Sequence, residues 1–298
     1  MSNTLVEIHS FEKATARHEP LTDEMCAKMN ELQKDDNNPL GFRAAAWNFT
    51  ALGRFGGFRC GEFAMDSKFT IRYYVLPDGS LVVCCFTLKN FKMYDDKGDN
   101  VRSPLQNRRK VAFTGTEFDV QKNRMNGQII TFKRLARKFK DYCPCENQLD
   151  ILARAQVLGN TAPDDPLCVY RDKKRRTCYL TGADMTAYYR FVMRLTRPNI
   201  SDEELTLIST HSLRVYACVL LHEAGKDGTP IKLRLRWLSD CFEVYLRNTN
   251  RICDQHNDAL SGSTKNMVKL ALEAIGLDGP VHVEGVINLS MDEIDDED

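Results

Sequence analysis

The chain has 298 residues, of which 43% are hydrophobic and 28% are charged, a composition that excludes an intrinsically disordered protein. Its longest uninterrupted apolar stretch, Val215 to Leu221, is far shorter than the roughly 20 residues that a membrane-spanning helix needs. The 41 basic and 41 acidic side chains sum to a net charge of zero, which taken alone argues against a nucleic-acid partner.

Helices are expected in the first sixty residues. The segment LTDEMCAKMNELQ begins a helix with Thr22 as its N-cap. A second helix runs from Gly41 through FRAAAWNFTALGRF and ends at Gly56-Gly57, where two glycines permit a tight turn. A short helix is expected after Arg59.

Two β-hairpins are expected next. Residues 69–76 and 81–88 are rich in β-branched and aromatic side chains and flank the turn sequence PDG. Residues 110–121 and 128–132 flank NRMNG, a second turn signal. We expect the four strands to pair as antiparallel hairpins.

Beyond residue 132 the pattern is mainly helical. Leu135 and Phe139 lie four residues apart in the basic segment KRLARKFK and are expected to form an apolar seam. Residues 159–180 are expected to be a loop that carries the basic run 173–176. Helices are expected near 146–158, 182–195, 201–209, 211–224, 239–249 and 263–275. The fold class is therefore α+β, a mainly helical core with a small antiparallel sheet.

Charge is distributed unevenly along the chain. Residues 101–140 hold eleven Lys and Arg against two acids, whereas residues 252–298 hold two lysines against eleven acids and end in MDEIDDED. The basic region predicts a local surface for double-stranded DNA, with a merely solvated face as the alternative. The acidic tail is expected to be disordered.

No sequence signal predicts a cofactor or a metal. Cys143 and Cys145 form a C-x-C pair, but no second Cys or His pair lies at zinc spacing. Neither a dinucleotide-binding nor a P-loop glycine pattern opens a helix. The N-terminus has no apolar signal segment, and eleven cysteines without one predict reduced thiols. We expect an intracellular protein, nuclear in a eukaryote and otherwise cytoplasmic, without a membrane partner.

Side chains suited to phosphodiester chemistry occur in four separate segments. Two arginines can clamp the non-bridging oxygens of a phosphodiester, and a lysine can protonate a departing alkoxide. A tyrosine can attack phosphorus, a histidine can take its proton, and an indole N–H can donate to an oxyanion. Each of these residues taken singly also fits a purely structural role. An Arg–Glu pair one helical turn apart commonly stabilises a helix, and a single Trp commonly packs in a core. The candidates are Arg59, Glu62, Lys122, His211, Arg214, Trp237 and Tyr245.

The order of these segments resembles the catalytic domain of the tyrosine recombinases, the phage-integrase-like enzymes. GGFRCGEF is similar to the family's first-arginine box, and FDVQKNRMNGQIITF is similar to its lysine hairpin. ISTHSLRVYACVLLHEAGKD resembles its H-x-x-R helix, and RLRWLSDCFEVYLRN resembles the segment that ends in the nucleophile. The resemblance implies an N-terminal tail at 1–19, a catalytic domain at 20–252, and a C-terminal helix with the acidic tail at 253–298.

The resemblance also implies a role for each candidate. Arg59 and Arg214 are the phosphate clamp, and Lys122 is the general acid for the 5′-oxygen, with Lys110 as its rival. His211 is the proton partner and Trp237 is a phosphate donor. Tyr245 is the nucleophile of a 3′-phosphotyrosine link, and Glu62 is the acid that orients the site. The residues expected to bind DNA are Arg124, Lys133, Arg134, Arg137 and Lys138.

Two departures from the family keep a second hypothesis open. The interval from Trp237 to Tyr245 is one residue shorter than usual, and only about 20 residues precede the similar region, which predicts that the family's DNA-clamping domain is absent. The alternatives are a DNA strand-exchange enzyme and a non-catalytic DNA-binding remnant of a mobile-element recombinase. A type IB topoisomerase fits the H-x-x-R order less well. The helix at 263–275 either packs on its own core or docks into a neighbouring protomer, and we expect self-association on DNA.

Overall fold

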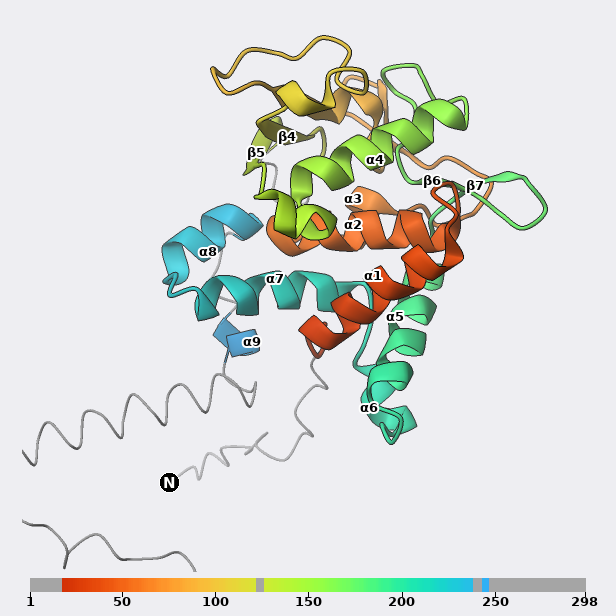
Figure 1. Ribbon diagram of the computed structural model, residues 1–298, viewed down its shortest axis with the longest axis vertical. Coiled ribbons are helices and arrows are strands. Elements are labelled where there is room, and N and C mark those ends of the chain that lie inside the picture. Colours follow the sequence, from red (N-terminus) through yellow and green to blue (C-terminus); the bar gives the residue numbers. More distant parts are fainter. Residues whose placement is uncertain (1–17, 122–125, 238–242, 247–298) are drawn as a thin grey trace, which may run out of the picture. The chain divides into compact units, whose positions relative to one another are not determined.

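Helix α2 (Phe42–Gly56) lies at the centre of the computed structural model, which describes residues 18–121, 126–237 and 243–246. Eleven of its 15 residues are buried, so it is enclosed on several sides. Helices α1 (Asp23–Asp36), α4 (Pro144–Val157) and α7 (His211–Glu223) pack against it (Figure 1). These three helices hold α2 in place and so fix the position of its C-terminal end, the turn at Gly56-Gly57.

The predicted helix ends in this region are confirmed. Thr22 caps α1, because its Oγ1 accepts a hydrogen bond from the backbone N–H of Met25 at 3.2 Å. Helix α2 ends at Gly57, which has φ +55° and whose N–H donates to the carbonyl of Gly53. The short helix α3 (Cys60–Phe63) follows Arg59.

The strands form small antiparallel sheets. Strands β1 (Tyr73–Val75) and β2 (Leu81–Val83) pair with each other, and β6 (Val169–Arg171) pairs with β7 (Thr177–Tyr179). A three-stranded sheet has the order β3 (Phe91–Tyr94), β4 (Phe113–Phe118) and β5 (Gln128–Lys133). The fold class predicted above, mainly helical with small antiparallel sheets, is therefore confirmed.

Some strand predictions were wrong in extent. Strand β1 covers only three residues of the expected 69–76, and all three are exposed. The strand is short because a two-stranded hairpin that packs on no core is only marginally stable. Strand β3 was not predicted, and the expected loop at 159–180 contains β6 and β7. The basic run 173–176 forms the turn between these two strands, where Asp172 pairs with Arg176 at 2.8 Å.

Most of the predicted C-terminal helices are present. They are α5 (Gly182–Thr196), α6 (Asp202–Thr206), α7, and α9 (Glu243–Leu246), of which α9 is the described part of the expected helix at 239–249. Helix α8 (Gly228–Leu235) was not predicted. The expected helix at 263–275, like the acidic tail, lies outside the described residues.

The predicted seam at 133–140 was wrong. Lys133 ends β5, and a 3₁₀ helix, η4 (Arg137–Tyr142), follows, with Phe139 50% exposed. Two further 3₁₀ helices are η2 (Leu88–Asn90) and η3 (Arg108–Lys110). The five consecutive residues 136–140 are all exposed and include too few apolar side chains to hold an amphipathic α-helix on the core.

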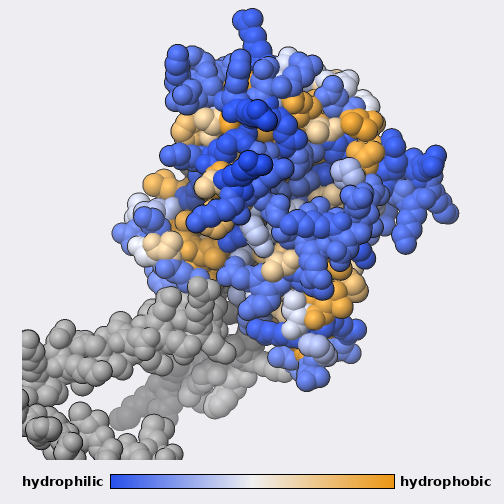
Figure 2. Space-filling view, in the orientation of Figure 1, coloured by the Kyte–Doolittle hydropathy of each residue, from blue (hydrophilic) through white to orange (hydrophobic). Residues whose placement is uncertain are grey.

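Two apolar clusters hold the described residues together. The larger one surrounds α2, and a smaller one, here called the second cluster, consists of Ala217, Cys218, Ile231 and Leu235, where α7 meets α8. Trp237 and Leu246 pack against the second cluster, which places α9 beside α7 (Figure 1). Hydrophilic side chains cover most of the described face in Figure 2. Within the described ranges, none of the helices combines the length and apolarity required to cross a membrane.

Candidate active site

Two buried arginines converge on the glycine turn that ends α2. Arg214, from the first turn of α7, donates from Nη1 to the carbonyl of Gly57 at 2.5 Å and also donates to the carbonyl of Leu235. Arg236, which follows α8, donates from Nη1 to the carbonyl of Gly56 at 2.8 Å. Each side chain is 1% exposed, and together they join α2, α7 and α8 at one point.

Arg59 and Glu62 lie next to this turn. The Glu62 carboxylate accepts from the backbone N–H of Arg59 at 2.8 Å, from its Nη1 at 3.1 Å, and from Nη2 of Arg236 at 2.8 Å. Arg59 also donates from Nη2 to the carbonyl of Arg236 at 3.1 Å. The candidates Arg59, Glu62 and Arg214 therefore lie around the same turn. The guanidiniums of Arg59 and Arg236 contact the one carboxylate, and that of Arg214 binds the carbonyl of Gly57, so positive charge exceeds negative charge here and suits an anion.

Trp237 covers the guanidinium of Arg214. The centre of that guanidinium lies 4.5 Å from the centroid of the indole ring, within the range of a cation–π interaction. The backbone N–H of Trp237 donates to the carbonyl of Lys232 at 3.0 Å, which holds the residue beside α8. Arg59 is more accessible, since 27% of its side chain is exposed.

His211 begins α7, one helical turn before Arg214. Burial, with the positive charges of His18, Arg214 and Arg59, lowers the pKa of His211 to about 4. Its ring centroid lies 5.2 Å from that of His18. At neutral pH the imidazole is therefore uncharged, the form that can accept a proton.

This pKa predicts a loss of stability in acid. A histidine whose folded pKa is lower than its unfolded value binds more protons when unfolded, so stability falls as the pH drops from 6.5 toward 4. At pH 5 the free energy of unfolding should be about 2 kcal/mol lower than at pH 7.5 through this residue, as urea titrations at both pH values would measure. His211→Gln should remove most of that difference, whereas His222→Gln, on the last turn of α7, should keep it. An unchanged acid loss in His211→Gln would show that another group is responsible.

The remaining catalytic candidates are described only in part. Lys122, like the DNA-binding candidate Arg124, lies outside the described residues. On either side of these, Gly127 N–H donates to the carbonyl of Phe118 at 2.7 Å. The backbone of Tyr245 lies in α9, beside the helix that carries Arg214, and its side chain is outside the described part. Lys110, the rival of Lys122, is exposed in η3.

The expected DNA-binding residues are not equivalent in the structure. Lys133, Arg137 and Lys138 are exposed. Arg134 instead uses its guanidinium internally, donating to the carbonyls of Val111 at 2.5 Å and Arg108 at 2.7 Å and pairing with Glu146. Its position is therefore that of a residue that holds β5, η3 and α4 together.

Arg236 and His18 were not predicted from the sequence as site residues. The signal for Arg236 was its position directly before Trp237, in a segment already singled out, but its buried contacts are to residues far away in the chain. His18 fell in the expected N-terminal tail, yet its Nδ1 lies 3.2 Å from the carbonyl of Leu207 and from Oγ of Ser209. In the described ranges, no group of three His, Cys, Asp or Glu side chains is arranged to hold a metal ion.

Comparison with solved structures gives weak likenesses, among them a recombinase. No family model and no curated protein matches the chain. The crystal structure of XerA recombinase is similar at a TM-score of 0.42 and 10% sequence identity, over 84% of this chain and 66% of that one. The chain thus spans slightly less than two thirds of that protein's length. A score of this size does not establish a shared fold, and the identity is too low to assign residues.

Proposed function

We propose that the chain is a tyrosine recombinase, a DNA strand-exchange enzyme that cleaves and rejoins DNA through a covalent 3′-phosphotyrosine intermediate. The observation that carries the proposal is that Arg59 and Arg214, from distant segments, both lie beside the Gly56-Gly57 turn. Arg214 donates there to the carbonyl of Gly57, and Arg59 donates to the carbonyl of Arg236. Glu62 orients Arg59 there, and the helix that contains Tyr245 packs on the helix that contains Arg214.

The arginines suit the binding of a scissile phosphate. Each guanidinium presents several N–H donors in a planar fork and keeps its charge at any physiological pH. In a partly buried site such donors stabilise the extra negative charge of a pentacoordinate phosphorus more than they would in water. Arg59 is the accessible member of the pair, and Arg214 lies buried behind it beneath Trp237, where it adds positive charge.

The proposed step balances without a cofactor. The phenolic oxygen of Tyr245 forms a bond to phosphorus while the bond to the 5′-oxygen breaks, which leaves a 3′-phosphotyrosine and a free 5′-hydroxyl. Uncharged His211 takes the phenolic proton, and Lys122 gives a proton to the departing 5′-oxygen. A bound phosphate compensates Arg59 and Arg214 and so raises the pKa of His211, which makes it a better base in the complex than in the free protein.

One observation favours a second candidate, a non-catalytic DNA-binding protein. Arg214 is 1% exposed beneath Trp237, and both of its terminal nitrogens donate to backbone carbonyls. A site that stayed in this state would bind DNA through the basic surface alone and would form no covalent bond.

The test is covalent capture of DNA. The full-length chain is incubated with a pool of randomised, fluorescently labelled duplexes that carry single nicks, and protein–DNA adducts are separated under denaturing conditions. We expect an adduct for the wild type and none for Tyr245→Phe, because that variant lacks the attacking oxygen.

Tyr73→Phe, on the exposed strand β1, serves as the matched control and should form the adduct at the wild-type level. An adduct of equal yield in Tyr245→Phe would reject Tyr245 as the nucleophile. DNA binding with no adduct in any variant would select the non-catalytic candidate.

A further inference from the structure

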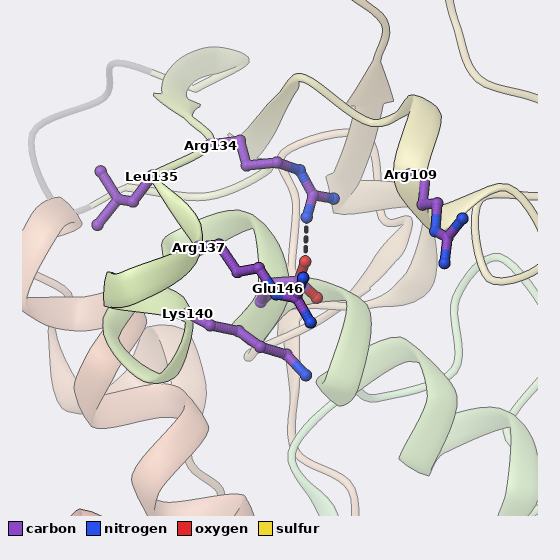
Figure 3. A pocket seen from close by; sticks show the side chains of 6 residues that line it. All are labelled: Arg109, Arg134, Leu135, Arg137, Lys140 and Glu146. Atoms are coloured by element: carbon purple, nitrogen blue, oxygen red, sulfur yellow. Dashed lines mark hydrogen bonds and ion pairs between the residues drawn. The ribbon is translucent and has the colours of Figure 1, made fainter.

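A basic pocket, which shares no lining residue with the site at the glycine turn, lies where η3, the end of β5, η4 and the start of α4 meet. It has a volume of about 580 Å³. Its lining consists of Arg109, Arg134, Leu135, Arg137, Lys140 and Glu146 (Figure 3). Four of these side chains are cationic and one is anionic, so the pocket suits an anion.

Two of the lining residues form its scaffold. Glu146 accepts from Arg134 and, at 2.9 Å, from Nη2 of Arg108, and Arg108 also donates to Asp150 at 2.6 Å. Although burial acts to raise the pKa of Glu146, its two arginine partners hold that pKa below the usual value. The Glu146 carboxylate is thus ionised, and the charges of Arg134 and Arg108 neutralise it. It therefore repels an incoming anion less than an unpaired carboxylate would.

Three cations remain available on the pocket walls. Within the described ranges, no hydrogen bond or ion pair engages the side chains of Arg109, Arg137 and Lys140, and all three residues are exposed. Arg137 and Lys140 come from η4 and Arg109 from η3, with the Arg134–Glu146 pair between them (Figure 3). Charges supplied from two sides can surround a phosphate group, whereas charges on one strip of surface cannot.

We propose that this pocket binds a backbone phosphate of DNA outside the cleavage centre, through Arg109, Arg137 and Lys140, with Leu135 against the neighbouring sugar. This inference deepens the proposed function, because it takes DNA as the ligand. The volume lies in the range of small-ligand pockets and exceeds what one phosphate fills, which leaves room for the attached nucleotide. Arg134 and Glu146 are positioning residues for the walls and make no contact with the ligand.

The salt dependence of DNA binding tests the pocket. Fluorescence anisotropy with a labelled 30-base-pair duplex is measured at several KCl concentrations for the full-length chain and for Arg109→Gln/Arg137→Gln/Lys140→Gln. Each lost phosphate contact should reduce the slope of log affinity against log salt by about 0.9 and weaken binding about eightfold at 0.1 M salt. We therefore expect a slope shallower by about 2 to 3 in the triple variant.

The matched control removes three cations elsewhere. Lys173→Gln/Lys174→Gln/Arg175→Gln changes the turn between β6 and β7 by the same charge and should leave the slope near the wild-type value. Equal reductions of the salt slope in both triple variants would show a general effect of charge and would overturn the proposal that this pocket binds a phosphate. Thermal melting should show that the pocket variant folds, since its three residues are exposed. Arg134→Gln, in contrast, should lower the melting temperature, because three internal contacts are lost.

A second arm identifies the source of the phosphate. Calorimetric titration with inorganic tripolyphosphate should show only weak binding if the ligand is a DNA backbone. Tight one-to-one binding of tripolyphosphate that depends on the three residues, together with an unchanged DNA slope, would overturn the assignment to DNA. Because these readouts need no cleavage, a normal pocket response without a covalent adduct would reject the proposed catalysis and keep the pocket. A covalent adduct, together with an unchanged salt slope in the pocket variant, would reject the pocket and keep the proposed catalysis.

Discussion

Glu62→Gln is expected to lower the free energy of unfolding by about 3–5 kcal/mol, the usual cost of breaking a buried ion pair on one side. The Glu62 carboxylate compensates the fully buried guanidinium of Arg236 and also holds Arg59. Burial lowers the pKa of Arg236, and the charge of Glu62 acts in the opposite direction. Glutamine keeps the shape but leaves a buried cation without a counter-charge. Urea unfolding followed by circular dichroism measures the change.

A surface pair provides the control for this prediction. Glu117 on β4 pairs with Lys92 at 3.0 Å, and both side chains are about a third exposed, so Glu117→Gln should cost about 0–1 kcal/mol. The double variant Glu62→Gln/Arg236→Met should be more stable than the sum of the single effects by about 0.5–3 kcal/mol, because it removes both charges. Equal losses in Glu62→Gln and Glu117→Gln would contradict the role given to the buried carboxylate.

The parts of the site that the sequence could predict are those set by local geometry. Arg59 and Glu62 lie three residues apart, and any helix that starts at Cys60 brings them together. His211 and Arg214 are likewise neighbours on one helix face because of their spacing. Helix α7 was predicted to within one residue, since its apolar residues repeat with the helical period.

The parts that could not be predicted depend on distant contacts or on unusual backbone. Arg236 ends α8 with φ +57°, a conformation that glycine usually supplies, so no local stop signal marked the helix. Arg175 has φ +62° in the turn between β6 and β7, and the lack of glycine there hid that hairpin in the same way. The positive φ of both arginines depends on the surrounding structure, which cannot be predicted from the neighbouring residues in the sequence.

The glycine turn shows how this packing constrains the site. The carbonyl of Gly57 accepts a hydrogen bond from Arg214, and Leu235 of the second cluster occupies the space that a Cβ at Gly57 would enter. A methyl group at Gly57 would lie 2.3 Å from Cδ2 of Leu235, which is fully buried. Substitution of Gly57 by alanine therefore carries two separate free-energy costs. One comes from the positive φ of the backbone, and the other comes from the close approach of α2 and α8.

Gly57→Ala is expected to lower the free energy of unfolding by about 2–5 kcal/mol in urea titrations. About 1–2 kcal/mol comes from placing alanine at positive φ, and about 1–3 kcal/mol comes from overpacking against Leu235. Gly225→Ala is the matched control, because Gly225 has φ +72° and nothing within 4 Å of the added methyl, so it should show only the backbone cost. If the two variants lose the same stability, the close approach does not constrain the turn. A larger loss at Gly57 would show that the carbonyl bound by Arg214 is held in place by packing between α2 and α8.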